Sequence, residues 1–287
     1  MQSTEKRNRF RTVLAGATCL HPASVFDPFS ARVADDLGFE VSVLAGSVAS
    51  MTVLGAPDHV TITLTELAGL ARRICRANAP PLLVDADHGF GNALNVRRTV
   101  EELETAGVSA VTIEDTNLPT SFAHTNKQRL ISLDEGVSKM CAALNARQDP
   151  ELVIVARTGA MGISDQDDAI RRVKAYEAVG VDALFLVNVR NREQLEAIHD
   201  AVSLPILMAH PGNELDLDFM QAHGVRICLQ MHLPVLAALK SVHDTMKALR
   251  DGQDQEQLAR DVTSTDLAKK TTRHQDYQRW IKSFLTP

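Results

Sequence analysis

The chain alternates short apolar runs with longer segments in which apolar residues recur every three or four positions. Short apolar runs bounded by glycine or polar residues are typical of buried strands, and the three-to-four spacing is typical of helices that bury one face. After a first apolar run at 13–20 and a loop at 21–27, the runs predict strands at 41–47, 81–87, 111–115, 152–158, 183–187, 205–209 and 225–229. Helical spacing predicts helices at 28–38, 65–77, 95–106, 133–146, 169–179, 193–201, 217–223 and 234–249.

Regular alternation of strand and helix predicts the fold class. A chain of 287 residues is long enough for one large barrel or for two ordinary domains. Eight strand-helix units of similar length favour an α/β fold, a single (β/α)8 TIM barrel domain over residues 1–287, above an open doubly wound sheet. No Gly-x-Gly-x-x-Gly motif follows the first strand, so the sequence predicts no dinucleotide site.

The segment 251–287 lies beyond the predicted barrel. A polar break is followed by Tyr277, Trp280, Ile281 and Phe284, which form an apolar stripe at helical spacing. We therefore expect a C-terminal helical segment. The stripe needs a surface to cover, and two alternatives stay open: its own barrel, or a neighbouring subunit of a homo-oligomer, either a dimer or a tetramer.

Composition narrows the range of partners. Lys and Arg number 30 against 36 Asp and Glu, so the mild negative charge gives no reason to expect nucleic acid or an anionic membrane surface. The polar start lacks a signal-peptide core, and no run approaches the ~20 apolar residues of a membrane span. Four scattered cysteines show no metal-ligand or redox spacing. We expect a cytoplasmic protein with reduced cysteines that acts on a small molecule.

Candidate chemistry starts at the strand predicted at 81–87. Its apolar run ends in Asp85 and Asp87, and a glycine-rich segment follows at once. Side chains alternate faces along a strand, so these two carboxylates are expected to point the same way. Parallel α/β folds place their chemistry at the carboxyl ends of strands. Two clustered carboxylates repel each other unless a cation lies between them, which predicts a divalent-metal site.

Two further strands end in charged residues. Glu114 and Asp115 close the strand at 111–115 and repeat the pattern of an apolar run closed by acids. Arg157 ends a strand that is otherwise wholly apolar, where a guanidinium is costly unless an anion meets it. Arg157 is therefore a candidate ligand for an anionic substrate.

Three more positions are candidates of a different kind. Gly46 and Ser47 offer backbone amides and a hydroxyl to a carboxylate or enolate oxygen, or else form a plain tight turn. His232 follows the last strand, at the rim where a substrate would bind, although a lone histidine is more often structural. His88 lies beside the acids but is expected to face away from them.

The motifs together resemble a known superfamily. Residues 46–50 (Gly-Ser-Val-Ala-Ser), 85–91 (Asp-Ala-Asp-His-Gly-Phe-Gly), 112–115 (Thr-Ile-Glu-Asp) and 154–158 (Ile-Val-Ala-Arg-Thr) occur in the order found in the isocitrate lyase and phosphoenolpyruvate mutase superfamily. The resemblance covers roughly residues 10–285. Within the superfamily, residues 21–27, residues 87–96 and His232 resemble the bacterial oxaloacetate decarboxylases.

The resemblance implies a magnesium-dependent carboxy-lyase, with Mn²⁺ as an alternative ion, that converts the 2-oxo dicarboxylate oxaloacetate to pyruvate and carbon dioxide through a metal-stabilised enolate. Magnesium takes few direct protein ligands and keeps several waters. The resemblance implies direct binding by Asp85, with Asp87 and Glu114 holding the waters. It implies substrate binding by Gly46, Ser47, Arg157 and His232, of which Arg157 and His232 are the catalytic candidates.

Other activities are weighed by what the chain lacks. Lyases of this superfamily carry a cysteine in a Lys-Lys-Cys-Gly-His segment, and the corresponding segment 117–130, itself a candidate lid, contains none. The sixth strand region ends in Asn188 without the glutamate expected in those lyases. Both departures argue against cleavage of 2-methylisocitrate. A non-catalytic barrel that binds a dicarboxylate is the second alternative. His210 and Pro211 stand where a tyrosine is expected, which leaves the preferred 2-oxo acid open.

Overall fold

The structure, a computed structural model, describes residues 3–120, 122, 127–212, 214–262 and 264–285. In this part of the chain, parallel strands form one sheet in sequence order: β1 (Ala23–Ser24), β2 (Ser42–Leu44), β3 (Leu82–Asp85), β4 (Ala110–Glu114), β5 (Val153–Thr158), β6 (Ala183–Leu186), β7 (Ile206–Ala209) and β8 (Val225–Leu229). Leu20, just before β1, donates to the carbonyl of Arg226 at 2.9 Å and accepts from Cys228 at 2.8 Å. These bonds link the segment that leads into β1 to the last strand, β8, and the predicted (β/α)8 fold is confirmed.

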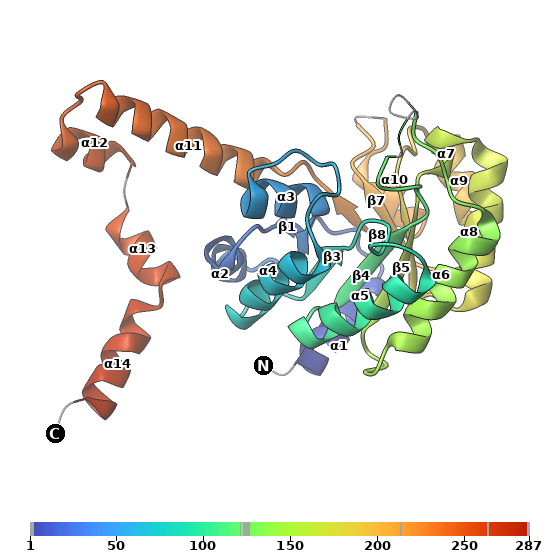
Figure 1. Ribbon diagram of the computed structural model, residues 1–287, viewed down its shortest axis with the longest axis horizontal. Helices are drawn as coiled ribbons and strands as arrows, with labels where there is room; N and C mark the ends of the chain where they lie inside the picture. The colour runs from blue at the N-terminus through green and yellow to red at the C-terminus, as the bar shows by residue number, and fades with distance from the viewer. Residues whose placement is uncertain (1–2, 121, 123–126, 213, 263, 286–287) are drawn as a thin grey trace.

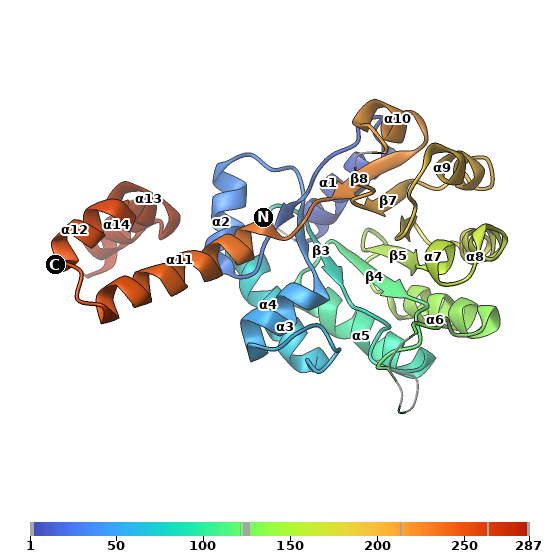
Figure 2. The ribbon, with the colours of Figure 1, turned by 90° about the horizontal axis from the view of Figure 1, so that it is seen from above.

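Helices surround the sheet (Figures 1 and 2). They are α2 (Pro28–Asp36), α3 (Gly46–Leu54), α4 (Leu64–Arg76), α5 (Ala93–Ala106), α6 (Leu133–Ala146), α7 (Ala160–Ile163), α8 (Gln166–Val179), α9 (Arg192–His199) and α10 (Leu217–Ala222). Local signals set several ends: the Asn92 side chain caps the start of α5, and Gly107 adopts a left-handed conformation at its end.

Helix α1 (Ser3–Ala15) closes the interior of the barrel at the end where the strands begin. This helix was not predicted from the sequence. Phe10 and Leu14 pack with inward-facing strand residues such as Leu83. Lys6 donates to the carbonyl of Ala79 at 2.6 Å, and Arg7 donates to that of Val108 at 3.0 Å. Both carbonyls precede strands. The polar residues at the start of the chain therefore donate hydrogen bonds to backbone carbonyls that immediately precede strands.

Two boundaries also correct the sequence analysis. Residues 21–27 were predicted to be a loop, but they contain strand β1. This strand has only two residues and is defined by its pairing with β2, so its own sequence does not mark it. The strand predicted at 41–47 ends at Leu44, and Gly46 is the first residue of α3. Gly46 and Ser47 therefore belong to a helix N-terminus and not to a plain tight turn.

The C-terminal segment leaves the barrel. Helix α11 (Leu233–Arg250) projects away from it, and α12 (Gln255–Val262), α13 (Thr265–Thr271) and α14 (His274–Phe284) follow (Figure 1). Arg273 forms an ion pair with Asp36 of α2 at 2.8 Å. The stripe on α14 is not covered by its own barrel, since the side chains of Tyr277 and Trp280 remain about half exposed. Among the described residues, no helix is long and apolar enough to cross a membrane.

Candidate active site

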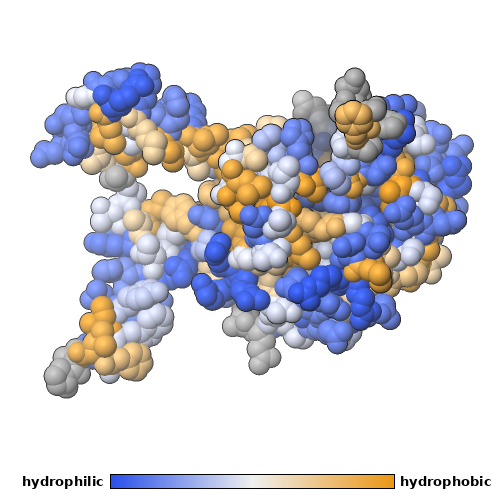
Figure 3. All heavy atoms as spheres, in the orientation of Figure 1, coloured by the Kyte–Doolittle hydropathy of each residue, from blue (hydrophilic) through white to orange (hydrophobic). Residues whose placement is uncertain are grey.

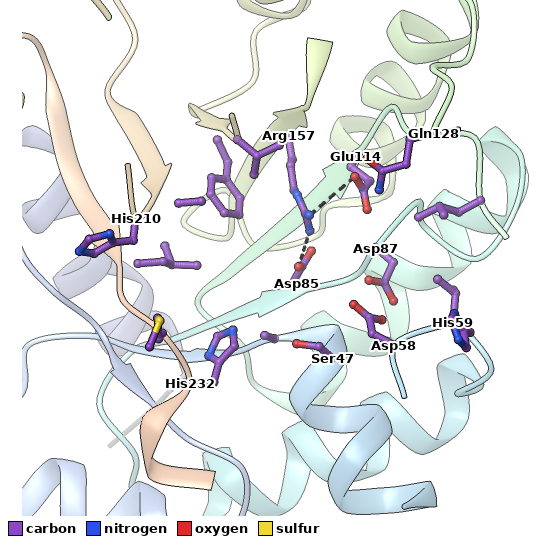
Figure 4. A pocket seen from close by; sticks show the side chains of 18 of the residues that line it. Ser47, Asp58, His59, Asp85, Asp87, Glu114, Gln128, Arg157, His210 and His232 are labelled. Atoms are coloured by element: carbon purple, nitrogen blue, oxygen red, sulfur yellow. Dashed lines mark hydrogen bonds and ion pairs between the residues drawn. The ribbon is translucent and has the colours of Figure 1, made fainter. Parts of the chain in front are cut away.

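A cavity of about 690 Å³ opens at the carboxyl ends of the strands (Figure 4). One side carries acidic residues and the other carries apolar residues and two histidines. The described lining residues are Ala45, Ser47, Asp58, His59, Val60, Asp85, Asp87, Glu114, Leu118, Pro119, Thr120, Gln128, Arg157, Phe185, Val187, Ala209, His210, Leu229, Gln230, Met231 and His232. The cavity thus lies at the end of a parallel barrel where enzymes of this architecture carry their chemistry.

Consecutive strands hold the centre of the acidic side. Asp85 ends β3, Glu114 ends β4 and Arg157 lies in β5. Arg157 Nη1 donates to Asp85 Oδ2 at 2.5 Å, and its Nη2 lies 3.7 Å from Glu114 Oε2. Thr112 donates to the other oxygen of Asp85 at 2.8 Å, and Thr116 donates to Glu114 at 2.5 Å. The paired strand ends therefore fix both carboxylates beside one guanidinium.

Asp87 reaches the same cavity from beyond the end of β3. Its backbone is left-handed, with φ of 47°, and its carbonyl accepts from the backbone N–H of Glu114 at 2.8 Å. A Cβ added to Gly46 would lie 2.5 Å from Asp87 Oδ1, so only glycine allows α3 to begin so close to this carboxylate. Asp58, from the loop after α3, points toward Asp87 across the cavity rim (Figure 4).

This crowding has an electrostatic consequence. Burial, together with the nearby charges of Asp85, Asp58 and Glu114, raises the pKa of Asp87 to about 8. Burial also raises the pKa of Glu114. The oxygen Oδ2 of Asp87 is buried without a hydrogen-bond partner among the described atoms. Arg157 forms the ion pairs with Asp85 and Glu114, and its charge does not offset the burial and mutual repulsion that raise the pKa of Asp87.

The donor set fits magnesium. Carboxylate oxygens are the ligands that Mg²⁺ prefers, and the unpartnered oxygen of Asp87 is available to a ligand. Within the described part of the chain, no three acidic, histidine or cysteine side chains converge closely enough to hold an ion directly. An ion here would therefore take few direct protein ligands and contact the other carboxylates through water, as Mg²⁺ commonly does.

The opposite side of the cavity carries the remaining candidates. His232 Nδ1 lies 2.8 Å from the hydroxyl oxygen of Ser24, and burial lowers the pKa of His232. Ser47 lies in the first turn of α3, where no side chain caps the helix. His210 lies across the cavity from the acids (Figure 4). The structure thus gathers every predicted site residue at or beside one cavity, although Gly46 acts by its small size and does not line it.

Two residues that help to form the site, Asp58 and Phe185, were not predicted from the sequence. Asp58 lies in a loop without periodicity, so no strand-end pattern marks it. Phe185 lies below Arg157, with the guanidinium carbon 5.3 Å from the centre of the ring. Its signal was present, because it lies one residue from the end of β6. His88, as expected, is buried and absent from the lining.

The closed parallel barrel and its acidic cavity define a protein of the (β/α)8 class with an enzyme-like site. Residues 10–250 match the family model described as phosphoenolpyruvate phosphomutase, and the chain belongs to this family. It is 53% identical to a protein of Bradyrhizobium diazoefficiens named oxaloacetate decarboxylase, over 95% of this chain and 94% of that relative. The resemblance stated from the motifs is confirmed.

Solved structures agree with this assignment. The phosphoenolpyruvate phosphomutase from Streptomyces platensis subsp. rosaceus superposes with a TM-score of 0.86 at 26% identity, covering 98% of this chain and 99% of that one. A phosphonopyruvate hydrolase in complex with oxalate and Mg²⁺ gives a TM-score of 0.85 at 25% identity, with both chains covered completely. Both share the fold of this chain.

Proposed function

We propose that the protein decarboxylates oxaloacetate to pyruvate and carbon dioxide with the help of Mg²⁺, or of Mn²⁺ in its place. The observation that carries the proposal is the gathering of Asp85, Asp87 and Glu114 beside Arg157 in one cavity. The relative named oxaloacetate decarboxylase, at 53% identity over nearly the whole chain, supports the choice of substrate.

In this proposal Asp85 binds the ion directly, and Asp87 and Glu114 hold its waters. Bound there, a divalent ion would supply positive charge close to the oxygen on which negative charge develops as the C4 carboxylate leaves as carbon dioxide. The side chains keep the ion at one edge of the cavity, because Asp85 is fixed by Thr112 and Glu114 by Thr116. A fixed ion site is preorganised for the charge that develops during the reaction.

Arg157, Ser47 and His232 bind and orient the dicarboxylate. Arg157 has a buried Nε without a partner among the described atoms, which leaves a donor for a substrate carboxylate. The uncapped first turn of α3 offers the Ser47 hydroxyl and backbone N–H groups to a second anionic oxygen. A Ser24 hydroxyl that donates to Nδ1 of His232 would keep the proton on Nε2, ready to donate to the enolate oxygen.

The cavity favours this reaction over carbon-carbon cleavage by a thiol base. Its described lining contains no cysteine, and the four cysteines of the chain lie elsewhere. Carbon dioxide release needs no base to remove a substrate proton. The apolar wall of Phe185, Val187 and Leu229 instead suits a neutral leaving molecule.

The test is a coupled assay of pyruvate release from oxaloacetate. Purified protein with Mg²⁺ should exceed the rate of Mg²⁺ alone, and Asp85→Ala should reduce the excess at least about 100-fold because the direct ligand is lost. Asp134→Ala, an exposed carboxylate at the start of α6, is the matched control and should keep full activity.

Three results would contradict the proposal. An excess rate of zero in the wild type would favour the dicarboxylate-binding alternative, and full activity in Asp85→Ala would remove the metal assignment. Release of pyruvate together with succinate from 2-methylisocitrate would favour the lyase alternative.

We also propose that the barrel carrying its C-terminal segment assembles as a homo-oligomer through α11. One face of α11 exposes apolar side chains at helical spacing: Leu236, Leu239, Val242, Met246 and Leu249. An apolar groove between α2 and the start of α11 is lined by Phe26, Phe29, Val33, Leu37, Phe39 and Leu233, among others. Figure 3 shows hydrophobic residues along α11 and at its junction with the barrel. A second copy that presents the same α11 face would cover the groove.

The cytoplasmic location stays a prediction.

A further inference from the structure

Lys139 is a buried cation behind the active site. It lies on α6, its residue is 2% exposed, and its Nζ donates to the carbonyl of His88 at 2.9 Å. No ion pair within 4.0 Å joins it to a carboxylate of the described residues, and the charges of Glu135, Asp115 and Glu114 act on it only from a greater distance. Burying an ammonium group is costly without compensation. A lysine kept in this position therefore needs a reason in the backbone that it contacts.

That backbone is the turn that carries Asp87. Four successive carbonyls, from residue 86 to residue 89, each accept a hydrogen bond. The donors are Gly89 N at 2.8 Å, Glu114 N at 2.8 Å, Lys139 Nζ at 2.9 Å and Thr99 Oγ1 at 3.0 Å. Two of these donors are buried side chains, one on α6 and one on α5.

The turn needs this restraint because its conformation is unfavourable. Asp87 has φ of 47° and Phe90 has φ of 62°, in the left-handed region that side chains with a Cβ seldom adopt. Such residues persist only where the surroundings determine the backbone. The direction of the Asp87 carboxylate depends on this turn, whereas Asp85 and Glu114 lie at the ends of strands.

We infer that Lys139 is a positioning residue: by binding the His88 carbonyl, and with Thr99 binding the next one, it holds Asp87 in the orientation that the metal and its waters require. The inference rests on the proposed metal site. The positive charge of Lys139 has the opposite effect on metal binding, because a cation behind the carboxylates repels a metal ion. Loss of Lys139 therefore weakens metal binding only if positioning is its role, and strengthens it if charge dominates.

The experiment measures Mn²⁺ binding to the full-length protein by electron paramagnetic resonance of the free ion, without substrate. Lys139→Met removes the donor at nearly constant volume, and we expect the Mn²⁺ dissociation constant to rise about tenfold, as for other partners of metal ligands. Thr99→Val removes the adjacent bond without a change in charge, and a smaller rise is expected. In turnover, the KM for Mg²⁺ should rise in both variants while kcat at saturating Mg²⁺ changes less.

Two controls separate positioning from general damage. Met140→Ala opens a cavity at the next residue of α6, and should lower the unfolding temperature while leaving Mn²⁺ affinity unchanged. Lys174→Met removes an exposed lysine from α8 and should change neither quantity.

Unchanged or tighter Mn²⁺ binding in Lys139→Met would overturn the inference. Should that variant fail to fold, Thr99→Val decides: weaker binding supports the inference and unchanged binding overturns it. A wild-type protein that binds no Mn²⁺ would instead remove the proposed metal site, and this inference with it.

Discussion

At the scale of residues, two carboxylates two positions apart reach one cavity by different routes. Asp85 ends a strand and is fixed by Thr112 and Arg157. Asp87 lies beyond the strand, and the left-handed backbone at its own position directs it. Alternation along a strand predicted that both face the same way, and they do share the cavity. Alternation of side chains along a strand explains the direction of Asp85 only.

The pKa of Asp87 gives a prediction for pH. Because burial and its acidic neighbours raise that pKa to about 8, the metal-free protein holds a proton there at neutral pH. Metal must displace this proton, so Mn²⁺ affinity should increase as pH rises from about 6 to 8, with proton release. The folded state binds the proton more tightly than the unfolded chain, so this group's contribution to the stability of the metal-free protein falls over the same range.

Calorimetry in buffers of different ionisation enthalpy checks the prediction by counting the released protons. Asp87→Asn serves as the control, because it removes the titrating group and should flatten the pH dependence. A wild-type affinity that is constant from pH 6 to 8.5 would contradict it.

At the scale of elements, α1 shows how a polar segment can close a barrel. Its basic side chains end on backbone carbonyls, and its apolar side chains fill the barrel floor. The segment looked polar because the residues that bond to these carbonyls are lysine and arginine. Long basic side chains can bury their stems while their charged ends find acceptors.

Arg7 tests the role of α1. It forms an ion pair with Asp149 at 2.6 Å and donates to the carbonyls of Glu104 and Val108, with only 5% of its side chain exposed. Arg7→Met leaves these acceptors without their donor and should lower the free energy of unfolding by about 2 to 4 kcal/mol. Urea denaturation followed by circular dichroism measures the loss.

The matched control is Arg98→Met on α5, an exposed arginine in an ion pair with Glu102. Surface pairs contribute about 0 to 1 kcal/mol, so this variant should be nearly neutral. Equal effects of the two substitutions would contradict a closing role for α1.

At the scale of the whole molecule, helix α11 at the start of the C-terminal segment has an apolar face that a single chain leaves uncovered. Helix α11 buries only Val235 among its described residues, whereas α4, α5 and α8 on the barrel bury five residues each. A helix with an uncovered apolar face is typical of an interface. Assembly through this face is therefore the arrangement we expect in solution.

Light scattering during size-exclusion chromatography tests the assembly. The wild type should elute as a dimer or a larger oligomer, and the double substitution Leu239→Glu with Met246→Glu should shift it to a monomer, because two charges would be buried in the interface. Ser241→Glu, an exposed position on the other side of α11, should leave the mass unchanged. A monomeric wild type would exclude the proposal.

The sequence by itself determined the alternation of strands and helices, and through it the barrel, because the spacing of apolar residues is a local property. It also marked Asp85, Glu114 and Arg157, since strand ends are readable from where an apolar run stops. Tertiary structure alone decided that Asp58 joins the acids, that α1 closes the barrel floor and that α11 leaves it. Each of these depends on contacts between segments far apart in the chain, and such contacts leave no periodic pattern in the residues that make them.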